Sequence, residues 1–408
     1  MSKNVVIVGA GAAGLIAALF ASQNGNNVLL LEKNEKCGKK IYITGKGRCN
    51  VTNLCDNNAF MANVVTNPKF LYPGLNAFTP KNLIDLLESL ECPIKIERGN
   101  RAYPVSEKAS DITNAFVKQL NKNQVSIRLN TKVENLIILD NQIKGVRLED
   151  GEIIKADAVI IATGGLSYPS TGSTGDGYRL LEQAGHKILP TYPSLVPYNS
   201  PDKNLIYLQG LSLKNITLNL KYNGKLIYSE LGEMLFTHFG VSGPLILTAS
   251  AHLAGKDLKK AKLSLNLKPA LDIEKLDKRI LREIESAPNK TINSLMNTMF
   301  PSRLAEVILE RCNINPNLVN NQISKKYRQC LINEIQNFDI PLSSSRDYTE
   351  AVITKGGANV KEFVPQTMES KIVKGLYAAG EVLDIDALTG GFNLHIAFIT
   401  GRSAGIAI

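Results

Sequence analysis

The stretch V-V-I-V-G-A-G-A-A-G, from Val5 to Gly14, decides the fold class of this chain. Its apolar half has the pattern of a buried strand, and its glycines lead directly into L-I-A-A-L-F-A-S-Q, which has helical composition. A second apolar run, Val28 to Glu32, ends in an acid 18 residues after Gly14. A strand, a tight turn, a helix and a second strand in such a short span form the unit of a parallel sheet. We therefore predict an α/β fold with a Rossmann-like sheet.

The glycines of this stretch have the spacing G-x-G-x-x-G of a dinucleotide-binding fingerprint. Gly9 permits the tight turn, Gly11 lets a pyrophosphate approach the backbone, and Gly14 lets the helix pack closely on the strand. The pyrophosphate would lie at the helix N-terminus, and Glu32 would accept hydrogen bonds from the adenosine ribose. A plain structural turn would need neither the two strands nor the acid. The spacing predicts a bound dinucleotide without separating FAD from NAD.

Three distant segments favour FAD. A-T-G-G (162 to 165) follows a buried strand and would bring small residues against the cofactor. G-L-Y-A-A-G-E (375 to 381) ends in glycine and an acid suited to a polyol such as the ribityl chain. T-G-G-F-N (389 to 393) opens the last helix, whose N-terminus could face the flavin N1–C2=O.

Composition places the chain among globular proteins. Its 408 residues are 44% hydrophobic and 21% charged, which suggests two or three domains. We find neither an apolar run of about 18 residues nor a secretory signal, so a cytoplasmic protein is expected. The six cysteines show no C-x-x-C spacing, so no metal site or disulfide framework is expected. The net charge of +10 could favour nucleic acid, but the lysines read as dispersed, and a nucleic-acid partner is not expected.

Further along, the sequence changes character twice. Prolines at 190, 193, 197 and 201 mark a domain crossing, and Asn223-Gly224 joins two β-type runs as a hairpin. Residues 272 to 336 have helical patterns, and the last helix is expected from about Asn393.

Several long motifs carry a family resemblance: G-K-K-I-Y-I-T-G-K-G-R-C-N-V-T-N (38 to 53), R-A-Y-P-V-S-E-K-A (101 to 109), L-F-T-H-F-G-V-S-G-P (235 to 244) and G-L-Y-A-A-G-E-V-L-D-I-D-A-L-T-G-G-F-N-L (375 to 394). With these the chain resembles the BaiN-like NAD(P)/FAD-dependent oxidoreductases, among the two-dinucleotide-binding-motif flavoproteins. The resemblance implies non-covalent FAD in a split Rossmann-like domain, residues 1–190 and 349–408. A β-barrel-like substrate-side domain, 191–270 and 337–348, would interrupt it and carry a helical insert, 271–336.

The resemblance also implies the residues that contact FAD, Val133 through its backbone. They are Gly9, Gly11, Ala13, Gly14, Glu32, Lys33, Lys40, Gly45, Gly47, Arg48, Cys49, Asn50, Val133, Thr163, Gly164, Gly165, Gly380, Glu381, Asp384, Gly391, Phe392, Asn393 and Leu394. The chain departs from the family pattern at Lys46 and Ala387, where glycine is common, and at His395, where glutamine is usual.

No catalytic residue is assigned from the sequence. Cys49 could form a redox pair with Cys37 or Cys55, but a small packed residue in a cofactor loop is the favoured interpretation. His238 and His395 are candidate proton donors, although a structural histidine is the more common role. The sequence does not choose between them.

The leading functional hypothesis is an FAD-dependent oxidoreductase that exchanges hydride between flavin N5 and a small molecule held between the FAD domain and the inserted domain. A-T-G-G followed by T-G-D-G is also similar to fumarate-reductase flavoproteins, which favours reduction or desaturation of an activated C=C bond; an oxidase is the alternative. We find no second dinucleotide fingerprint, so NAD(P)H would reach the flavin through the substrate opening. The rival hypothesis is an RNA-binding or tRNA-modifying flavoprotein. Substrate identity and oligomeric state stay open.

We predict that the purified protein is yellow and that Gly11→Glu abolishes flavin retention, because the new carboxylate would fill the pyrophosphate position and repel its charge. The ratio of flavin to protein absorbance after purification measures this. A colourless wild type that takes up no FAD on reconstitution would contradict the predicted cofactor.

Overall fold

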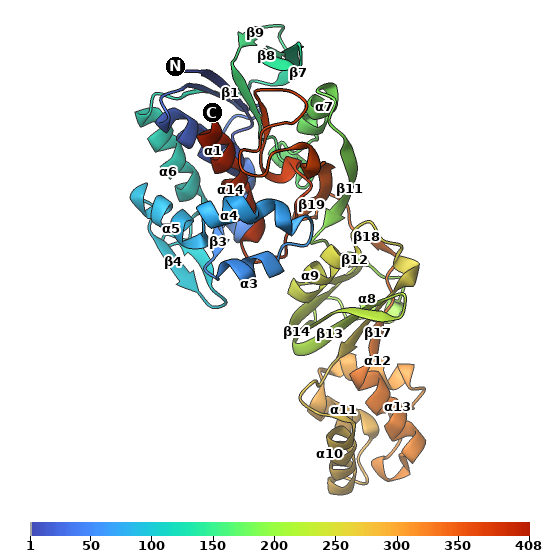
Figure 1. Cartoon of the computed structure of the whole chain (residues 1–408). Helices are drawn as coiled ribbons and strands as arrows, with labels where there is room; N and C mark the ends of the chain where they lie inside the picture. Colours follow the sequence, from blue (N-terminus) through green and yellow to red (C-terminus); the bar gives the residue numbers. More distant parts are fainter. Residues whose placement is uncertain (1) are drawn as a thin grey trace. The chain divides into compact units, whose positions relative to one another are not determined.

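The computed structural model describes residues 2–408, which divide into two compact units. The core unit runs from the N-terminal part of the chain to Ser194 and resumes over Asp347–Ile408; the inserted unit is Leu195–Arg346. The predicted crossings near 190 and 349 lie close to these junctions. In Figure 1 the first (blue) and last (red) segments of the chain both belong to the core unit. No helix within residues 2–408 has both the length and the apolar character needed to cross a membrane.

A five-stranded parallel sheet organises the core unit, as the glycine fingerprint predicts. Its order is β20-β10-β1-β2-β6, with bounds Leu376–Ala378, Ala158–Ile161, Asn4–Val8, Asn27–Leu31 and Ser126–Arg128. In-register pairs such as Val6 with Leu29 and Val6 with Val159 fix the centre of the sheet. All four residues of β10 are buried, so this strand has an apolar environment on both faces.

Two long helices meet through glycines beside this sheet. They are α1 (Ala12–Gln23) and α14 (Phe392–Ala407), from opposite ends of the chain. A Cβ on Gly14 would lie 1.9 Å from the Gly9 carbonyl oxygen, and one on Gly401 would lie 2.2 Å from the Ala13 oxygen. Glycine is therefore required at both positions, and α1 is held between β1 and α14.

Smaller elements complete the core unit. An antiparallel meander is formed by β7, β8 and β9 (Val133–Leu139, Gln142–Leu148, Ile153–Lys155). A second antiparallel sheet has the order β3-β5-β4 (Thr52–Asn53, Arg101–Pro104, Ile94–Glu97), and β11 (Ile188–Ser194) pairs with β19 (Ile353–Ala358). The remaining helices are α2 (Lys39–Ile43), α3 (Asn57–Ala62), α4 (Tyr72–Ala77), α5 (Pro80–Ser89), α6 (Ala109–Lys122) and α7 (Asp176–Gln183).

The inserted unit contains a seven-stranded sheet of the order β17-β16-β13-β14-β15-β12-β18. The bounds are Phe338–Ile340, Ala261–Asn266, Ser212–Tyr222, Lys225–Thr237, Gly240–Ser242, Tyr198–Asn199 and Ser344–Ser345. The predicted hairpin is correct: Asn223 and Gly224, both at positive φ, join β13 to β14. The pairings run from β17 at one edge to β18 at the other without joining these strands, so the barrel-like character is not confirmed.

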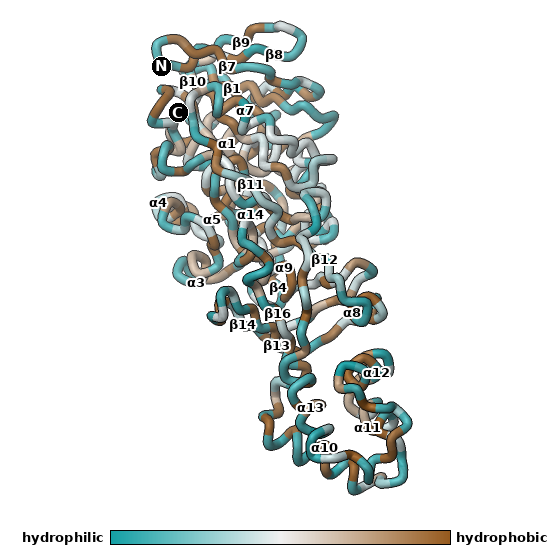
Figure 2. The backbone as a smooth tube through the Cα atoms, turned by 90° about the vertical axis from the view of Figure 1, so that its right-hand side faces the viewer, coloured by the Kyte–Doolittle hydropathy of each residue, from teal (hydrophilic) through white to brown (hydrophobic). Residues whose placement is uncertain are grey.

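Helices of the inserted unit share one apolar core with its sheet. They are α8 (Lys203–Tyr207), α9 (Pro244–Leu253), α10 (Ile273–Ser286), α11 (Ile292–Met299), α12 (Ser302–Arg311) and α13 (Lys325–Gln336). Figure 2 shows hydrophilic and hydrophobic residues alternating along α10 and α13, as amphipathic helices do. The helices of the predicted insert, residues 271–336, thus pack in the same apolar core as the sheet of this unit.

His395, in the first turn of α14, is a packing residue. Its side chain is fully buried, its Nδ1 lies 2.6 Å from the Thr52 hydroxyl, and its Nε2 lies 3.1 Å from the Phe78 carbonyl oxygen. A neutral ring that donates to the carbonyl and accepts from the hydroxyl satisfies both contacts. Burial lowers the pKa of His395 to about 4, so at neutral pH the ring is the neutral imidazole, whose one N–H is held by the Phe78 carbonyl, and it is not an acid that could supply a proton. A glutamine amide offers the same pair of one donor and one acceptor.

Gly14→Ala should lower the free energy of unfolding by about 2–3 kcal/mol, because the new methyl group must displace the backbone of Gly9. Gly11→Ala is the matched control, since a Cβ there has no atom within 4 Å and φ is −79°. Urea denaturation of the FAD-free variants measures both. Equal stability of the two variants would show that the close contact does not constrain the fold.

The wild type should lose about 2 kcal/mol more stability than His395→Gln between pH 7.5 and pH 5. The folded pKa of His395, about 4, lies below the ordinary value of 6.5. The contribution of His395 is therefore complete above pH 6.5 and declines as the pH falls toward 4, because the unfolded chain binds the proton first. Denaturation curves at both pH values test this, and parallel losses in the two proteins would refute it.

Candidate functional site

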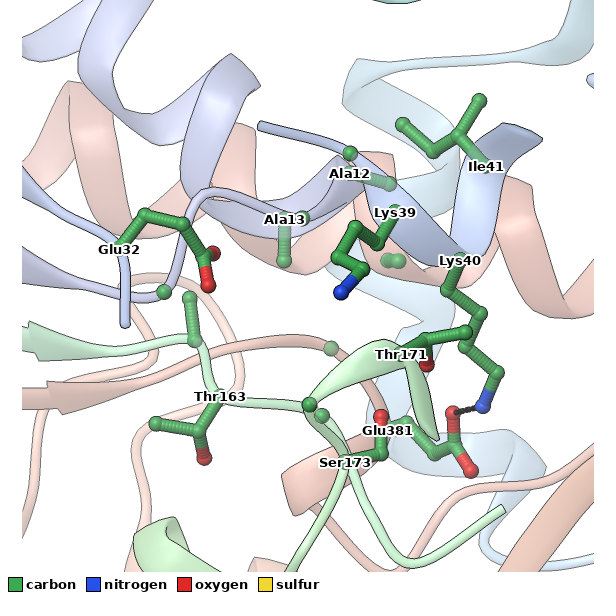
Figure 3. A pocket seen from close by; sticks show the side chains of 18 of the residues that line it. Ala12, Ala13, Glu32, Lys39, Lys40, Ile41, Thr163, Thr171, Ser173 and Glu381 are labelled. Atoms are coloured by element: carbon green, nitrogen blue, oxygen red, sulfur yellow. Dashed lines mark hydrogen bonds and ion pairs between the residues drawn. The ribbon is translucent and has the colours of Figure 1, made fainter. Parts of the chain in front are cut away.

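A long pocket opens in the core unit where β1 and β10 end; the empty space in and in front of it, including open solvent, is about 1320 Å³. Ligands of open parallel sheets bind at this edge, outside the carboxyl ends of the strands. The turn after β1, the turn after β10 and the start of α14 all contribute to its wall. Figure 3 shows Glu32 toward one end of the pocket and Lys40 with Glu381 toward the other.

The glycine turn after β1 leaves room on the pocket side. Gly9 has φ +101°, and a Cβ there would lie 2.5 Å from the Ala162 carbonyl oxygen, so this position packs against β10. Gly11, in contrast, has open space where its Cβ would be. It immediately precedes α1, whose first turn offers backbone N–H groups to an anion.

Glu32 is held rigidly at the end of β2. The Ala10 N–H donates to its Oε2 (2.9 Å), and the backbone and side-chain N–H groups of Asn34 donate to its Oε1 (2.9 and 2.6 Å). Its side chain is buried, yet it lines the pocket. A carboxylate has about four acceptor sites, so capacity remains for hydroxyl groups of a ligand.

An ion pair between Lys40 and Glu381 lies at the opposite end of the pocket. Lys40 Nζ donates to Glu381 Oε2 at 2.6 Å and to the Ser167 hydroxyl at 2.5 Å (Figure 3 shows the first contact). The Ser167 hydroxyl in turn donates to Glu381 Oε1 at 2.6 Å, and the Thr354 N–H donates to the same oxygen at 2.9 Å. Four segments far apart in sequence are therefore tied together at the pocket wall.

Unpartnered polar groups test whether a dinucleotide suits this pocket. The residue Thr163 lines the pocket, and its Oγ1 is buried without a hydrogen-bond partner. α14 begins after Gly391 with no side-chain cap, which leaves N–H groups of its first turn for an acceptor. Buried polar groups normally have partners, so the pocket fits a ligand rich in oxygen atoms, as FAD is.

The structure brings many of the predicted contact residues to this pocket. Those that line it are Gly9, Gly11, Ala13, Glu32, Lys33, Lys40, Val133, Thr163, Gly164, Gly380, Glu381, Asn393 and Leu394. Those that do not are Gly14, Gly45, Gly47, Arg48, Cys49, Asn50, Gly165, Asp384, Gly391 and Phe392. Gly14 packs on Gly9, and burial raises the pKa of Asp384, whose carboxylate accepts from Asn67 Nδ2 at 2.9 Å.

Other residues that line the pocket are not among the predicted FAD contacts. They include Ile41, Thr44, Thr131, Thr171, Ser173, Asp176, Val352 and Ile353. Thr171, Ser173 and Asp176 belong to the stretch S-T-G-S-T-G-D-G, whose last four residues are the T-G-D-G motif similar to that of fumarate-reductase flavoproteins. Asp176 forms an ion pair with Lys33 at 2.6 Å. Val352 and Ile353 are ordinary apolar residues that reach the pocket only because β19 returns beside it.

The loop from Gly45 to Asn50 is built from left-handed residues. Gly45, Lys46 and Cys49 have φ of 60°, 59° and 59°. Lys46 is therefore a strained position, consistent with the glycine usual there in the family that the chain resembles. Cys49 is fully buried and burial raises the pKa of its thiol, while burial raises the pKa of Cys37 to about 11. Both thiols are poor nucleophiles, and the favoured interpretation of Cys49 as a packed residue agrees with its burial.

A second hollow, with about 1110 Å³ of empty space, lies beside the start of α14; we call it the arginine cleft. Its lining includes Arg48, Arg98 and Arg101, together with Thr389, Gly390 and Phe392. Arg48 is engaged by Glu97 (2.5 Å) and Glu107 (3.2 Å), whereas Arg98 and Arg101 are exposed. Residues 389 to 394 thus border both the arginine cleft and the long pocket.

Comparison with known proteins agrees with this geometry. The chain is 31% identical to the ribosomal RNA dihydrouridine synthase of Escherichia coli (97% of this chain, 95% of the relative). It is 30% identical to the 3-dehydro-bile acid delta(4,6)-reductase of Clostridium scindens (99% and 98%). Two solved structures share the fold. Quinol fumarate reductase from Escherichia coli has a TM-score of 0.52 and 17% sequence identity, and the match covers 100% of this chain and 69% of that one. The 3-ketosteroid delta1-dehydrogenase from Sterolibacterium denitrificans has a TM-score of 0.51 and 12% sequence identity, and the match covers 99% of this chain and 98% of that one. Residues 3–407 match the family described as HI0933-like protein Rossmann domain, and the chain therefore belongs to this family of FAD-dependent oxidoreductases.

Proposed function

We propose that this protein holds FAD in the long pocket and uses it to reduce a C=C bond conjugated to a carbonyl group. The observation that carries the cofactor assignment is the continuity of the pocket, from the glycine turn to the uncapped start of α14. When bound, FAD supplies hydride transfer at N5. The N-terminus of α1 would hold the pyrophosphate, Glu32 would accept hydrogen bonds from the ribose, and the first turn of α14 would hold the flavin pyrimidine.

The proposed role of the Lys40–Glu381 ion pair is to orient bound groups, without taking part in bond making or breaking. An ammonium group has three N–H donors, and Lys40 uses two of them on Glu381 and Ser167. The third N–H is left for a bound group. With Glu381 fixed by Thr354 and Ser167, the positive charge of Lys40 stays at the pocket wall, where it stabilises negative charge that develops on the cofactor or substrate.

The choice of C=C reduction comes from what the two relatives have in common. Dihydrouridine differs from uridine by saturation of a ring C=C bond next to a carbonyl, and a delta(4,6)-reductase saturates double bonds of a 3-oxo steroid skeleton. Both relatives match this chain over nearly its whole length. The arginine cleft, on the other side of residues 389 to 394, offers Arg98 and Arg101 to an anionic part of such a substrate.

The proposed electron donor is NADH or NADPH. Neither the sequence nor the sheets of residues 2–408 contain a second strand, glycine turn and helix of the dinucleotide type. The nicotinamide would therefore visit the flavin from the substrate side and leave before the substrate binds.

The charge of the inserted unit favours RNA as the substrate class of a second candidate function, RNA modification. This unit has 20 Lys and Arg against 13 Asp and Glu, whereas the core unit has 27 against 24. Most of the net charge of +10 therefore lies in the smaller unit. A uracil base in RNA contains the same conjugated C=C bond, so the two candidates differ in substrate and not in chemistry.

The FAD-loaded protein, reduced anaerobically with NADH, NADPH or dithionite, should regain its oxidised flavin spectrum when mixed with a cyclic α,β-unsaturated ketone or with uridine-containing RNA. The saturated ketone of the same skeleton is the control, because it offers no C=C bond. Stopped-flow absorbance follows the reoxidation, and mass spectrometry identifies the saturated product. Reoxidation by oxygen alone, with no unsaturated acceptor consumed, would contradict the proposal in favour of an oxidase.

A further inference from the structure

Six lysines gather at one end of the sheet of the inserted unit, and we call this group the lysine face. Its members are Lys221, Lys225, Lys256, Lys259, Lys260 and Lys262, and all six are exposed. Lys221 and Lys225 lie on either side of the Asn223–Gly224 turn, and the Asn223 N–H donates to the Lys260 carbonyl oxygen at 3.0 Å. The expectation of dispersed lysines is therefore wrong for this unit, because the hairpin places residues 221–225 against residues 256–262.

Strand register makes the members direct neighbours. Lys221 on β13 lies opposite Lys262 on β16, and Tyr222 lies opposite Lys225 across the turn. Neighbouring strands are about 4.8 Å apart, so the two ammonium groups share one small area. The Lys256 ammonium lies 5.1 Å from the centre of the half-buried Tyr222 ring, which packs against the apolar core on the opposite face of β13 from Lys221.

These charges lack acidic partners. Within residues 2–408 no carboxylate lies in ion-pair distance of any of the six, whereas Lys33, Lys40 and Lys132 are each paired. The acid next to them in sequence, Asp257, turns its carboxylate to the backbone, where the Lys259 N–H donates to it at 3.0 Å. Like charges directly opposite on neighbouring strands destabilise a sheet. A partner that neutralises them relieves this repulsion.

The pattern of the charges indicates the kind of partner. Lysine is a point charge that suits phosphate, and the lysine face has no arginine for forked recognition of a single carboxylate. A group of such charges suits a chain of phosphates, because several ammonium groups can each neutralise one phosphate of the same backbone. A small anionic substrate would engage only one or two of the six.

We propose that the lysine face binds the phosphate backbone of RNA. The choice of RNA over other polyanions rests on the second candidate function above, and the surface itself rests on the contacts just described. Lysine contacts of this kind position a nucleic acid without reading its sequence.

Two quadruple variants of the full-length, FAD-loaded protein test the proposal. One carries Lys221→Gln, Lys225→Gln, Lys260→Gln and Lys262→Gln. The other carries Lys278→Gln, Lys290→Gln, Lys325→Gln and Lys326→Gln, four exposed lysines of the same unit with no acidic partner in ion-pair distance among the described residues. Both lose the same net charge, and flavin content and thermal unfolding verify that both fold.

Fluorescence anisotropy with a labelled single-stranded RNA of about 20 uridines, over a series of KCl concentrations, gives the affinity. The lysine-face variant should bind at least about tenfold more weakly, and the slope of log affinity against log salt should flatten by about 2–3. The control variant should stay within about twofold of the wild type. Equal losses in the two variants, or an absence of salt-dependent RNA binding by the wild type, would overturn the proposal.

Vesicles of phosphatidylserine and phosphatidylcholine form a separate arm, because exposed Leu226 and Leu231 lie on the neighbouring strand. Binding to vesicles but not to RNA would assign the surface to lipid and overturn the RNA assignment. Reduction of the unsaturated ketone should be unchanged in the lysine-face variant. Failure of that reaction in all proteins would count against the proposed function alone.

Discussion

The contact between Gly14 and the Gly9 carbonyl is the constraint on which the rest of the core unit depends. With no side chain between them, α1 approaches the turn after β1 so closely that its N-terminus points along the end of the sheet. On the other side of α1, Gly401 and Gly405 of α14 lie equally close to the α1 backbone, so α14 packs directly against α1. Two helix N-termini from opposite ends of the chain consequently border one pocket.

The pocket of the core unit and the lysine face of the inserted unit differ in how their charged side chains are paired. In the pocket two lysines are paired with carboxylates, Lys40 with Glu381 and Lys33 with Asp176, and Glu32 is held by N–H donors. Such pairing preserves geometry in a partly buried site while keeping its net charge small. On the lysine face the charges stand without partners in water, where screening makes their repulsion tolerable. The pocket is thus suited to one ligand in one pose. The lysine face is suited to a long ligand that can bind in many poses.

Local patterns predicted the parallel sheet, the Asn223–Gly224 hairpin and the last helix, because each depends on periodicity or on a residue that favours a turn. They did not foretell that Val352 and Ile353 reach the pocket, since this follows from the return of β19 and not from any property of valine or isoleucine. The role of His395 needed its surroundings, because a histidine in a first helical turn looks the same in sequence whether it meets solvent or the Phe78 carbonyl. The lysine face was hidden for a related reason: its members are separated by about thirty residues and meet only through strand register.

The order of the segments along the chain has a consequence for biosynthesis. β1, α1 and β2 leave the ribosome first, but β20 and α14 follow only after the entire inserted unit has been made. The inserted unit has its own apolar core and can acquire its structure in the interval, while the buried faces of β10 and α1 still lack their neighbours. The pocket is therefore complete only after the whole inserted unit has been made, and until then the half-finished sheet would expose apolar surface that chaperones could shield.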